Sequence, residues 1–533
     1  MPSETKRGAV RIVANYARLG TTVLLGLILV PVLIHGIGSD GYGLYALVGA
    51  SVGFAQMFKD ISRASMNREL GSSFHSGDPA AFRRTYAAAC VVALGLATLS
   101  LLAFAALLLV VPLLEIPVGL HGAARWAITA AGATTFVTVA LSPQSNMYMV
   151  TERFASYNVR QTLERVVYTG VAIVLFLVLD VGDPASPGRG LVLFSVCSNL
   201  GSTLVTLAAV ASILRLEPLL RPLGLRADRE SIRRVLGTSG WNALTTTAMN
   251  LHLRVDALLM NLFFALGGNA SFGLAVTLTS YVRMLTVGVT DGLDAVTARV
   301  SSGADADKAD RGVRLLLSHT TRLAAAIALP AGVFVFVLAG PILDVWVGHR
   351  TPQARGFVPS ATPMVQALVV GMTVRAVTDN WMRVLYGAGH VARYGLQVLA
   401  GGILNPLAAT GYILLVDRGA SLAPALAFTG VMVGVHLLLL PRTVHRSLGM
   451  KYSEVIAPLA RPSLVALAVA PIPIAAASLV SDWRLWILGS TAALYAIAYA
   501  PLGWFVVLRP EERQRLRRAI LRRGGTRGGI SGR

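Results

Sequence analysis

The sequence predicts an all-α integral membrane protein that crosses the bilayer about fourteen times, with both termini in the cytoplasm. Of its 533 residues, 54% are apolar and only 14% are charged, and the mean hydropathy is +0.64. A soluble protein would carry about 25% charged residues. The apolar residues also fall in runs of about twenty, and a helix of that length crosses the hydrocarbon layer of about 30 Å.

Fourteen apolar runs are long enough to be transmembrane helices. The run at 165–181 is the shortest, and only a brief glycine-containing turn separates the first two runs. The expected spans are 13–36, 42–62, 86–112, 126–149, 165–181, 191–213, 236–264, 272–297, 320–342, 361–385, 394–416, 420–440, 462–480 and 485–508.

The net charge of +21 follows the predicted topology. With the first residue in the cytoplasm, six basic residues lie in outer loops, three lie inside spans, and the other 38 of the 47 Lys and Arg lie on the inner side. The outer six are Arg125, Arg189, Arg350, Arg355, Arg418 and Arg484. This is the positive-inside bias of membrane proteins, so the basicity indicates orientation rather than binding of nucleic acid.

Several functional classes are disfavoured by what the sequence contains. The two cysteines, Cys90 and Cys197, both fall inside spans and suggest neither a disulfide framework nor a metal site. The first apolar run lacks a small-residue cleavage site, so we expect it to remain as a span. There is no glycine-rich Walker-type loop. The cytoplasmic loops are too short for a catalytic domain, so we expect a non-enzymatic protein without cofactor or metal.

Two short echoes indicate an internal duplication. GYGLYAL at 41–47 resembles ASFGLAV at 270–276, and YMVTERFASY at 148–157 resembles LYGAGHVARY at 385–394. Each pair falls at the same point of a six-span unit, which predicts two lobes related by an axis along the membrane normal. We therefore expect one lobe at 1–216, a cytoplasmic linker at 217–233, a second lobe at 234–446, two further helices within 447–508 and a basic cytoplasmic tail at 509–533.

Ionisable residues inside the spans are the strongest functional signal. An Arg near the bilayer centre costs about 2.5–3.5 kcal/mol on insertion scales, so it needs a polar or aqueous destination. One polar helical face combines Arg254 with Thr247, Asn250 and Asn261. A second combines Arg283 with Ser280, Thr290, Asp291 and Asp294, and the first span has Arg11, Asn15, Arg18 and Thr22 in line. Such stripes predict a hydrated cavity between the lobes.

The competing interpretation is that each Arg pairs with an acid and only holds helices together. We favour that interpretation for Arg375, since Asp379 lies four residues further on the same face. Arg254 has Asp256 nearby but on another face, and Arg283 has no acid within four residues. We expect these two to line the cavity. Arg18 can line the cavity near its inner end or anchor the helix at the headgroups.

A cavity with several Arg and few uncompensated acids favours an anionic cargo. The planar guanidinium donates paired hydrogen bonds that suit phosphate oxygens, so pyrophosphate is a natural ligand. The expected substrate-binding residues are Arg18, Arg254, Arg283, Asn250 and Asn15. The candidates for coupling transport to protons or sodium are Asp256, Asp291, Asp294 and Asp379. His252, one turn from Asp256, is interpreted as a packed histidine.

Several segments resemble the polysaccharide-exporting flippases, of the O-antigen type, in the multidrug/oligosaccharidyl-lipid/polysaccharide (MOP) exporter superfamily. They are NYARLGTTVLLGLILVPVLIHGIGSDGYGLYAL at 15–47, KDISRASMNREL at 59–70, SGDPAAFRR at 76–84, ERFASYN at 152–158 and LYGAGHVARYGLQVLAGGILN at 385–405. The resemblance covers most of 11–450. It departs at Asp60-Ile61, where this group often has Asp-Gly.

The resemblance implies two six-helix lobes in a MATE-like V, plus an extra helix pair, in the bacterial cytoplasmic (inner) membrane. It implies a flippase that moves an undecaprenyl-pyrophosphate-linked oligosaccharide to the outer leaflet by alternating access, with Arg18, Arg254 and Arg283 placed to engage the pyrophosphate. The partners would be this lipid-linked glycan, membrane lipids and glycosyltransferases or a polymerase of the same pathway. Alternatives are a multidrug or cation antiporter or a lipid II flippase of the superfamily, and an integral membrane glycosyltransferase or polymerase.

Overall fold

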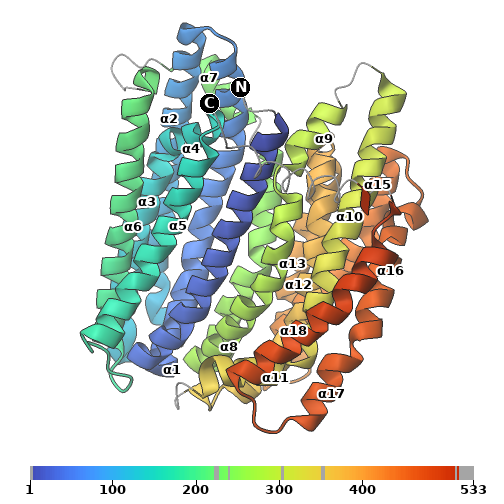
Figure 1. Cartoon of the computed structure of the whole chain (residues 1–533). Coiled ribbons are helices and arrows are strands. Elements are labelled where there is room, and N and C mark those ends of the chain that lie inside the picture. Colours follow the sequence, from blue (N-terminus) through green and yellow to red (C-terminus); the bar gives the residue numbers. More distant parts are fainter. Residues whose placement is uncertain are drawn as a thin grey trace, which may run out of the picture.

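The computed structural model of the chain describes residues 4–220, 227–237, 240–301, 305–349, 354–510 and 513–514. Within these ranges the fold is all-α, as the sequence predicts. The helices of the first half are α1 (Glu4–His75), α2 (Pro79–Val110), α3 (His121–Ala140), α4 (Ser142–Val150), α5 (Phe154–Ile173), α6 (Gly188–Leu216) and α7 (Arg229–Gly237). They form one bundle, at the left of Figure 1.

The second bundle, at the right of Figure 1, is built from the described helices that follow. Its helices are α8 (Gly240–Thr290), α9 (Leu293–Ser301), α10 (Ala306–Val337), α11 (Ala339–Leu343), α12 (Val358–Gly387), α13 (Val391–Leu415), α14 (Ala423–Val431), α15 (Leu440–Leu448), α16 (Tyr452–Val469), α17 (Pro471–Leu479) and α18 (Leu485–Leu502). The two bundles meet mainly along α1 and α8 and spread apart toward the upper end of the view. The predicted arrangement in two lobes is thereby confirmed.

Helices α1 and α8 are each two helical segments joined across a break. The breaks lie at Gly38, with φ of 64°, and at Ala265, with φ of 51°. Glycine adopts this left-handed region without penalty, whereas alanine pays about 1 kcal/mol or more there. Each break comes shortly before one of the two echoed segments, GYGLYAL and ASFGLAV. The turns therefore fall close to equivalent points of the predicted duplication.

The number of spans is close to the expected one. Eleven helices in the described ranges are long and apolar enough to cross a membrane, or twelve when α3 and α4, bent by 51°, are taken as one broken span. Counting both segments of α1 and of α8 separately would bring this to the expected fourteen, a count that stays a prediction. The fifth span is longer than expected, because it runs from Phe154 to Val178 rather than over 165–181.

The lobes touch closely at the end where α1 and α8 turn. A Cβ added at Gly43 would lie 2.2 Å from the carbonyl oxygen of Leu266, so the backbones of α1 and α8 cross here almost in contact. The Asn261 amide bonds both backbone groups of Glu115, at 3.1 and 3.2 Å. These contacts close this end of the interface between the lobes and leave a cavity further along it.

Candidate functional site

A cavity of about 450 Å³ lies between the two lobes, near the middle of α1 and α8. Its walls come from the second segment of α1, both segments of α8, and α12. Its lining residues include Tyr42, Tyr45, Gly49, Asn250, Arg254, Asn269, Thr277, Ser280, Arg283, Met372 and Arg375. Among the lining residues that the structure describes, three are arginines and none carries a carboxylate. The cavity surface is therefore strongly cationic.

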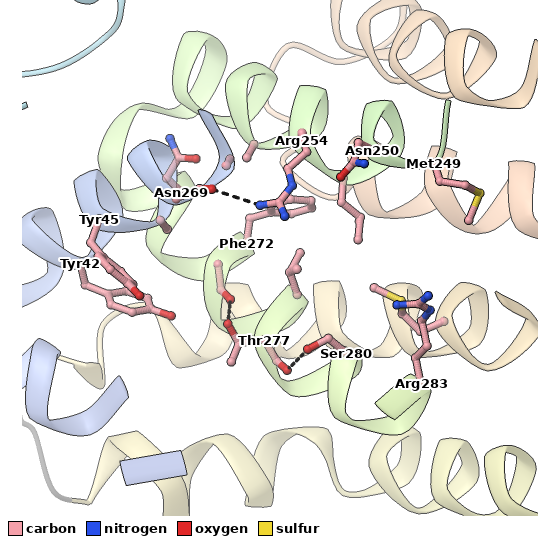
Figure 2. Close-up of a pocket in the computed structure, with 18 of the residues that line it drawn as sticks. Tyr42, Tyr45, Met249, Asn250, Arg254, Asn269, Phe272, Thr277, Ser280 and Arg283 are labelled. Carbon is pink, nitrogen blue, oxygen red and sulfur yellow. Dashed lines mark hydrogen bonds between the residues drawn. The ribbon is translucent and has the colours of Figure 1, made fainter. Parts of the chain in front are cut away.

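Arg254 reaches from α8 across the interface to α1. Its Nη1 donates a hydrogen bond of 3.1 Å to the carbonyl oxygen of Gly49. One turn further, the guanidinium packs against Gly53, where an added Cβ would lie 2.0 Å from Cζ. The absence of a side chain at Gly53 therefore leaves room for the guanidinium, while Gly49 contributes its carbonyl. Figure 2 shows Arg254 and Arg283 in the cavity wall, on the two segments of α8.

Arg283 and Arg375 share one carboxylate, that of Asp379 on α12. The Arg283 Nε donates to Asp379 Oδ2 at 2.7 Å, and the Arg375 Nε lies 3.9 Å from Oδ1. The sequence shows no acid within four residues of Arg283, and the partner that the fold provides is 96 residues away. The local pairing expected for Arg375 exists, but this arginine also lines the cavity.

A second charge cluster joins the lobes near the beginning of α1. Asp291, just after α8, lies 3.3 Å from Arg383 Nη2 on α12 and 4.0 Å from Arg18 Nη2 on α1. All three side chains are 22–35% exposed. Arg18 is not a lining residue of the cavity, so its structural role here is a contact between the lobes. The cluster lies between the cavity and the end of the molecule where α1 begins.

Asp256 lies in the interior of the second lobe, away from the cavity lining. It is fully buried, and Asn405 Nδ2 of α13 donates to both of its carboxylate oxygens at 2.9 Å. The same Nδ2 donates to the backbone carbonyl of His252, one turn earlier on α8. The His252 ring is also fully buried, with its centroid 6.0 Å from that of His436. Asp256 and the two imidazoles thus form a buried ionisable cluster.

Of the remaining predicted site residues, some line the cavity and others lie elsewhere. Asn250 lines the cavity as expected. Asn261, expected on the same polar face, instead ties the lobes together through Glu115. Asp294 lies on α9, where its backbone packs against Gly387 of α12. The side chain of Asn15 lies outside the described part of the structure.

Sequence reasoning missed part of the cavity surroundings. Tyr42 and Tyr45 line the cavity from α1. Arg165 lies on α5, three residues before Tyr168, whose ring contacts the same Phe194 that Tyr45 contacts. The sequence places this arginine at the edge of a short span, whereas the observed helix begins at Phe154 and carries it inward. The helical pattern that continues through the charged residues before position 165 is the signal that could have shown this.

An apolar pocket of about 470 Å³ lies next to the cavity, between α1, α8, α10 and α18. Its lining residues include Val23, Leu278, Tyr281, Leu285, Pro330, Phe334, Tyr495 and Tyr499. The hydroxyls of Tyr495 and Tyr499 bond backbone carbonyls of α10, at 3.1 and 2.8 Å. Because both hydroxyls are bonded to the backbone, the surface of the pocket consists mainly of carbon atoms. One segment of α8 contributes to both, with Ser280 lining the cationic cavity and Tyr281 lining the apolar pocket.

The chain matches no family model and no curated protein sequence. Solved structures match it over nearly its whole length. A lipid II flippase MurJ in an inward closed conformation has a TM-score of 0.64 at 12% identity, covering 92% of this chain and 98% of its own. The MATE multidrug transporter DinF-BH, solved as a complex, gives 0.61 at 13% identity, covering 84% and 98%.

An inward-facing multidrug MATE transporter of the MOP superfamily gives a TM-score of 0.59 at 13% identity, covering 88% of this chain and 100% of its own. At such identities the likeness establishes the fold. It confirms the resemblance seen in the sequence segments at that level and makes the chain a multi-pass membrane protein like these transporters. The chain therefore has the fold of the MOP-superfamily exporters, which is shared by lipid flippases and multidrug transporters.

Proposed function

We infer that the protein is a flippase that moves an undecaprenyl-pyrophosphate-linked oligosaccharide between leaflets. One observation carries the proposal: Arg254, Arg283 and Arg375 line one cavity whose described lining has no carboxylate. A guanidinium donates paired, charge-assisted hydrogen bonds to phosphate oxygens, and a low-dielectric site strengthens them. Arg254 and Arg283 are the proposed pyrophosphate ligands, with Asn250 as a neutral donor.

The apolar pocket beside the cavity supports a lipid carrier for that pyrophosphate. A prenyl chain loses water-exposed apolar area when it lies in such a pocket, at about 25 cal/mol per Å². The segment around Tyr281 would then stand between the charged head and the chain. This combination of a cationic and an apolar compartment fits an amphipathic substrate, whose two parts need different surroundings.

The two lobes suggest transport by alternating access in the bacterial inner membrane, with both termini in the cytoplasm. Opening one end of the interface requires loss of the cluster of Arg18, Asp291 and Arg383. Opening the other requires separation of α1 and α8 near Gly43. Glycosyltransferases or a polymerase of the same pathway are the expected partners, since they would supply and consume the lipid-linked glycan.

Among the four candidate coupling residues, Asp256 is the one we favour. Asp379 and Asp291 each form ion pairs with arginines. Asp294 lies on the short α9 near the end of the lobe. Asp256 is fully buried beside His252, and it accepts hydrogen bonds from a neutral amide, that of Asn405. Its carboxylate can therefore change charge state or bind a cation during transport.

The test is export of the finished glycan by variants at Arg254. We expect Arg254→Ala to lower transport roughly ten- to a hundredfold, because it removes a charge-assisted contact in a low-dielectric cavity. Arg254→Lys should be partly active, since an ammonium keeps the charge but not the fork. Arg418→Ala, in the loop after α13, is the matched control. Normal export by Arg254→Ala, with the protein inserted at normal levels, would contradict the assignment.

A lipid II flippase is the second candidate. The described cavity chemistry suits any prenyl-pyrophosphate glycan, and the solved structure with a TM-score of 0.64 is a lipid II flippase. Depletion of the protein separates the two: accumulation of peptidoglycan precursor with loss of viability supports lipid II, whereas loss of a surface polysaccharide alone supports the first proposal. The three arginines that line the cavity would repel a cationic drug, so they disfavour a multidrug antiporter for cations.

A further inference from the structure

A second cationic pocket lies away from the cavity, between α10 and α16. Its volume is about 400 Å³. The lining residues are Arg314, Leu315, Ser318, Arg322, Met450, Glu454, Ala457, Pro458, Arg461 and Arg509. The helices α10 and α16 pack side by side at the right of Figure 1. Among the described residues, none lines both this pocket and the transport cavity.

The pocket has four arginines and one carboxylate among its described lining residues. Arg314, Ser318 and Arg322 follow one another at spacings of four, so they form a polar stripe on α10. Arg322 is only 6% exposed, which places its charge in a poorly solvated position. Arg314 is partly exposed and Arg461 and Arg509 are exposed, so the repulsion among these like charges is strongest at the buried Arg322. An anion bound among them would lower that electrostatic energy.

The backbone leaves room for this arrangement. Arg314 reaches from α10 to the turn between α15 and α16, where a Cβ added at Gly449 would lie 2.9 Å from its Nη2. Gly449 also has φ of 63°, in the left-handed region. A side chain at this position would be strained and would crowd the guanidinium. The glycine thus keeps Arg314 at the mouth of the pocket.

The pocket lies about two helical turns in from the beginnings of α10 and α16, beside exposed apolar side chains. Arg314 lies eight residues after the start of α10, and Arg461 nine residues after the start of α16. At 1.5 Å per residue both lie roughly 12–14 Å from the helix ends. Leu464 and Leu467, further along α16, are 66% and 65% exposed, as expected for side chains facing acyl chains. Leu315, in the pocket wall, is also 65% exposed.

We propose that this pocket binds the phosphate of an anionic phospholipid, whose acyl chains lie along the exposed leucines of α16. Basic pockets between transmembrane helices are suited to anionic headgroups. Arg314 of α10 and Arg461 of α16 bind the phosphate, and Arg322, about two turns further along α10, adds positive charge. Arg509 adds a further charge where the chain leaves the last helix. A free phosphate would satisfy the arginines but leave the apolar wall without a ligand.

The test is lipid binding by the purified full-length protein in detergent, titrated with phosphatidylglycerol and observed by native mass spectrometry. We expect Arg314→Gln with Arg461→Gln to weaken binding about tenfold or more, since both charge-assisted contacts are lost. Arg229→Gln with Arg233→Gln, on the exposed face of α7, removes the same charge elsewhere and should leave binding unchanged. Phosphatidylcholine, with no net charge, should bind about tenfold more weakly than phosphatidylglycerol.

A variant that is expected to tighten lipid binding shows that misfolding does not explain the weaker binding of the double arginine variant. Glu454 supplies the one carboxylate among the described lining residues and accepts a hydrogen bond of 3.0 Å from the Lys451 backbone N–H. Glu454→Gln keeps that cap but removes the negative charge, so it should tighten phosphatidylglycerol binding several-fold. Unchanged binding in both the double variant and Glu454→Gln would overturn the proposal. So would inorganic phosphate that binds as tightly as the lipid, because the acyl chains would then contribute nothing.

Discussion

Arg254 of α8 donates a hydrogen bond of 3.1 Å to the carbonyl of Gly49 on α1. The arginine that we assign to the substrate thus also joins the two lobes at mid-depth. Separation of the lobes would break this bond and release the guanidinium, so a change in the position of the lobes would change the cavity charge available to an anion. Substitutions on the α1 surface that contacts Arg254 should therefore affect transport.

Gly53→Ala should reduce export while leaving the fold intact. The added Cβ would lie 2.0 Å from Arg254 Cζ, so the flexible guanidinium must leave its place against α1. Glycan export by the inserted protein should fall at least about tenfold, because the substrate loses one charge-assisted contact. Gly49→Ala is the matched control, because nothing lies within 4 Å of a Cβ at that position and the carbonyl remains. Equal activity of the two variants would refute the importance of this placement.

The fold was predictable from the sequence because lipid imposes a simple requirement. Long apolar helices and the bias of basic residues predict a multi-pass helical protein, and the two echoed segments predict its two lobes. The beginning of the fifth span was not predictable from hydropathy, since Arg160 and Glu164 form an ion pair at 2.9 Å within it. The two charges compensate each other inside the helix, whereas a hydropathy average counts them as two separate polar residues.

The candidate site was predictable only in part. Arg254 and Asn250 line the cavity because a polar face on an apolar helix has few other places to lie. Pairing across the lobe was not visible, as Asp379 is 96 residues from Arg283. Similarly, Arg18 has the polarity of a cavity residue, and only the relative position of the lobes places it opposite Asp291. Helical periodicity gives the face of a residue but not the partner that meets that face.

Asp379→Asn should destabilise the second lobe. It leaves the guanidinium groups of Arg283 and Arg375 facing each other without the carboxylate that they share. Loss of one partner of a buried ion pair costs about 3–5 kcal/mol, and we expect about 1–3 kcal/mol here because Arg283 is 36% exposed. Thermal unfolding in detergent measures the change.

The double variant Arg283→Gln with Asp379→Asn is the control for this ion pair. If the pair accounts for the cost, the double variant should be more stable than the sum of the single changes implies, by about 1 kcal/mol or more. Strict additivity of the two substitutions would show that the 2.7 Å contact contributes no coupling.

Asp291→Asn should favour separation of the lobes at the end where α1 begins. The carboxylate lies between Arg18 and Arg383, and its loss removes the ionic contact that this cluster makes between the lobes. The groups are a quarter to a third exposed, so the shift should be modest, roughly three- to tenfold in population. Labelling of Ser280→Cys in the cavity wall, with Cys90 and Cys197 replaced by Ala, reports the opening.

Asp307→Asn, on the exposed first turn of α10, is the control for that labelling experiment. It removes the same charge outside the cluster and should not alter the rate. The difference between the two variants should also shrink at about 1 M salt, where the Debye length falls to about 3 Å. A labelling rate for Asp291→Asn equal to that of the parent would show that the cluster does not hold the lobes together.

Asp256→Asn should uncouple transport from its driving ion. Asparagine keeps an oxygen that can accept from Asn405 Nδ2, so the packing of α8 against α13 should survive. The variant cannot exchange a proton or offer a charged oxygen to sodium, since the carboxylate is gone. In proteoliposomes, an imposed proton or sodium gradient should accelerate the parent several-fold and leave Asp256→Asn near the rate without a gradient.

His252→Gln and His436→Gln are the matched variants for this coupling experiment, because the two buried imidazoles lie in the same lobe as Asp256 and could store a proton separately. If Asp256 alone carries the coupling ion, both histidine variants should keep the response of the parent to the gradient. If Asp256→Asn and both histidine variants responded to the gradients as the parent does, coupling would have to reside in one of the other three acidic candidates. Asp291 would then be the first to test, because its contacts with Arg18 and Arg383 must change when the lobes separate.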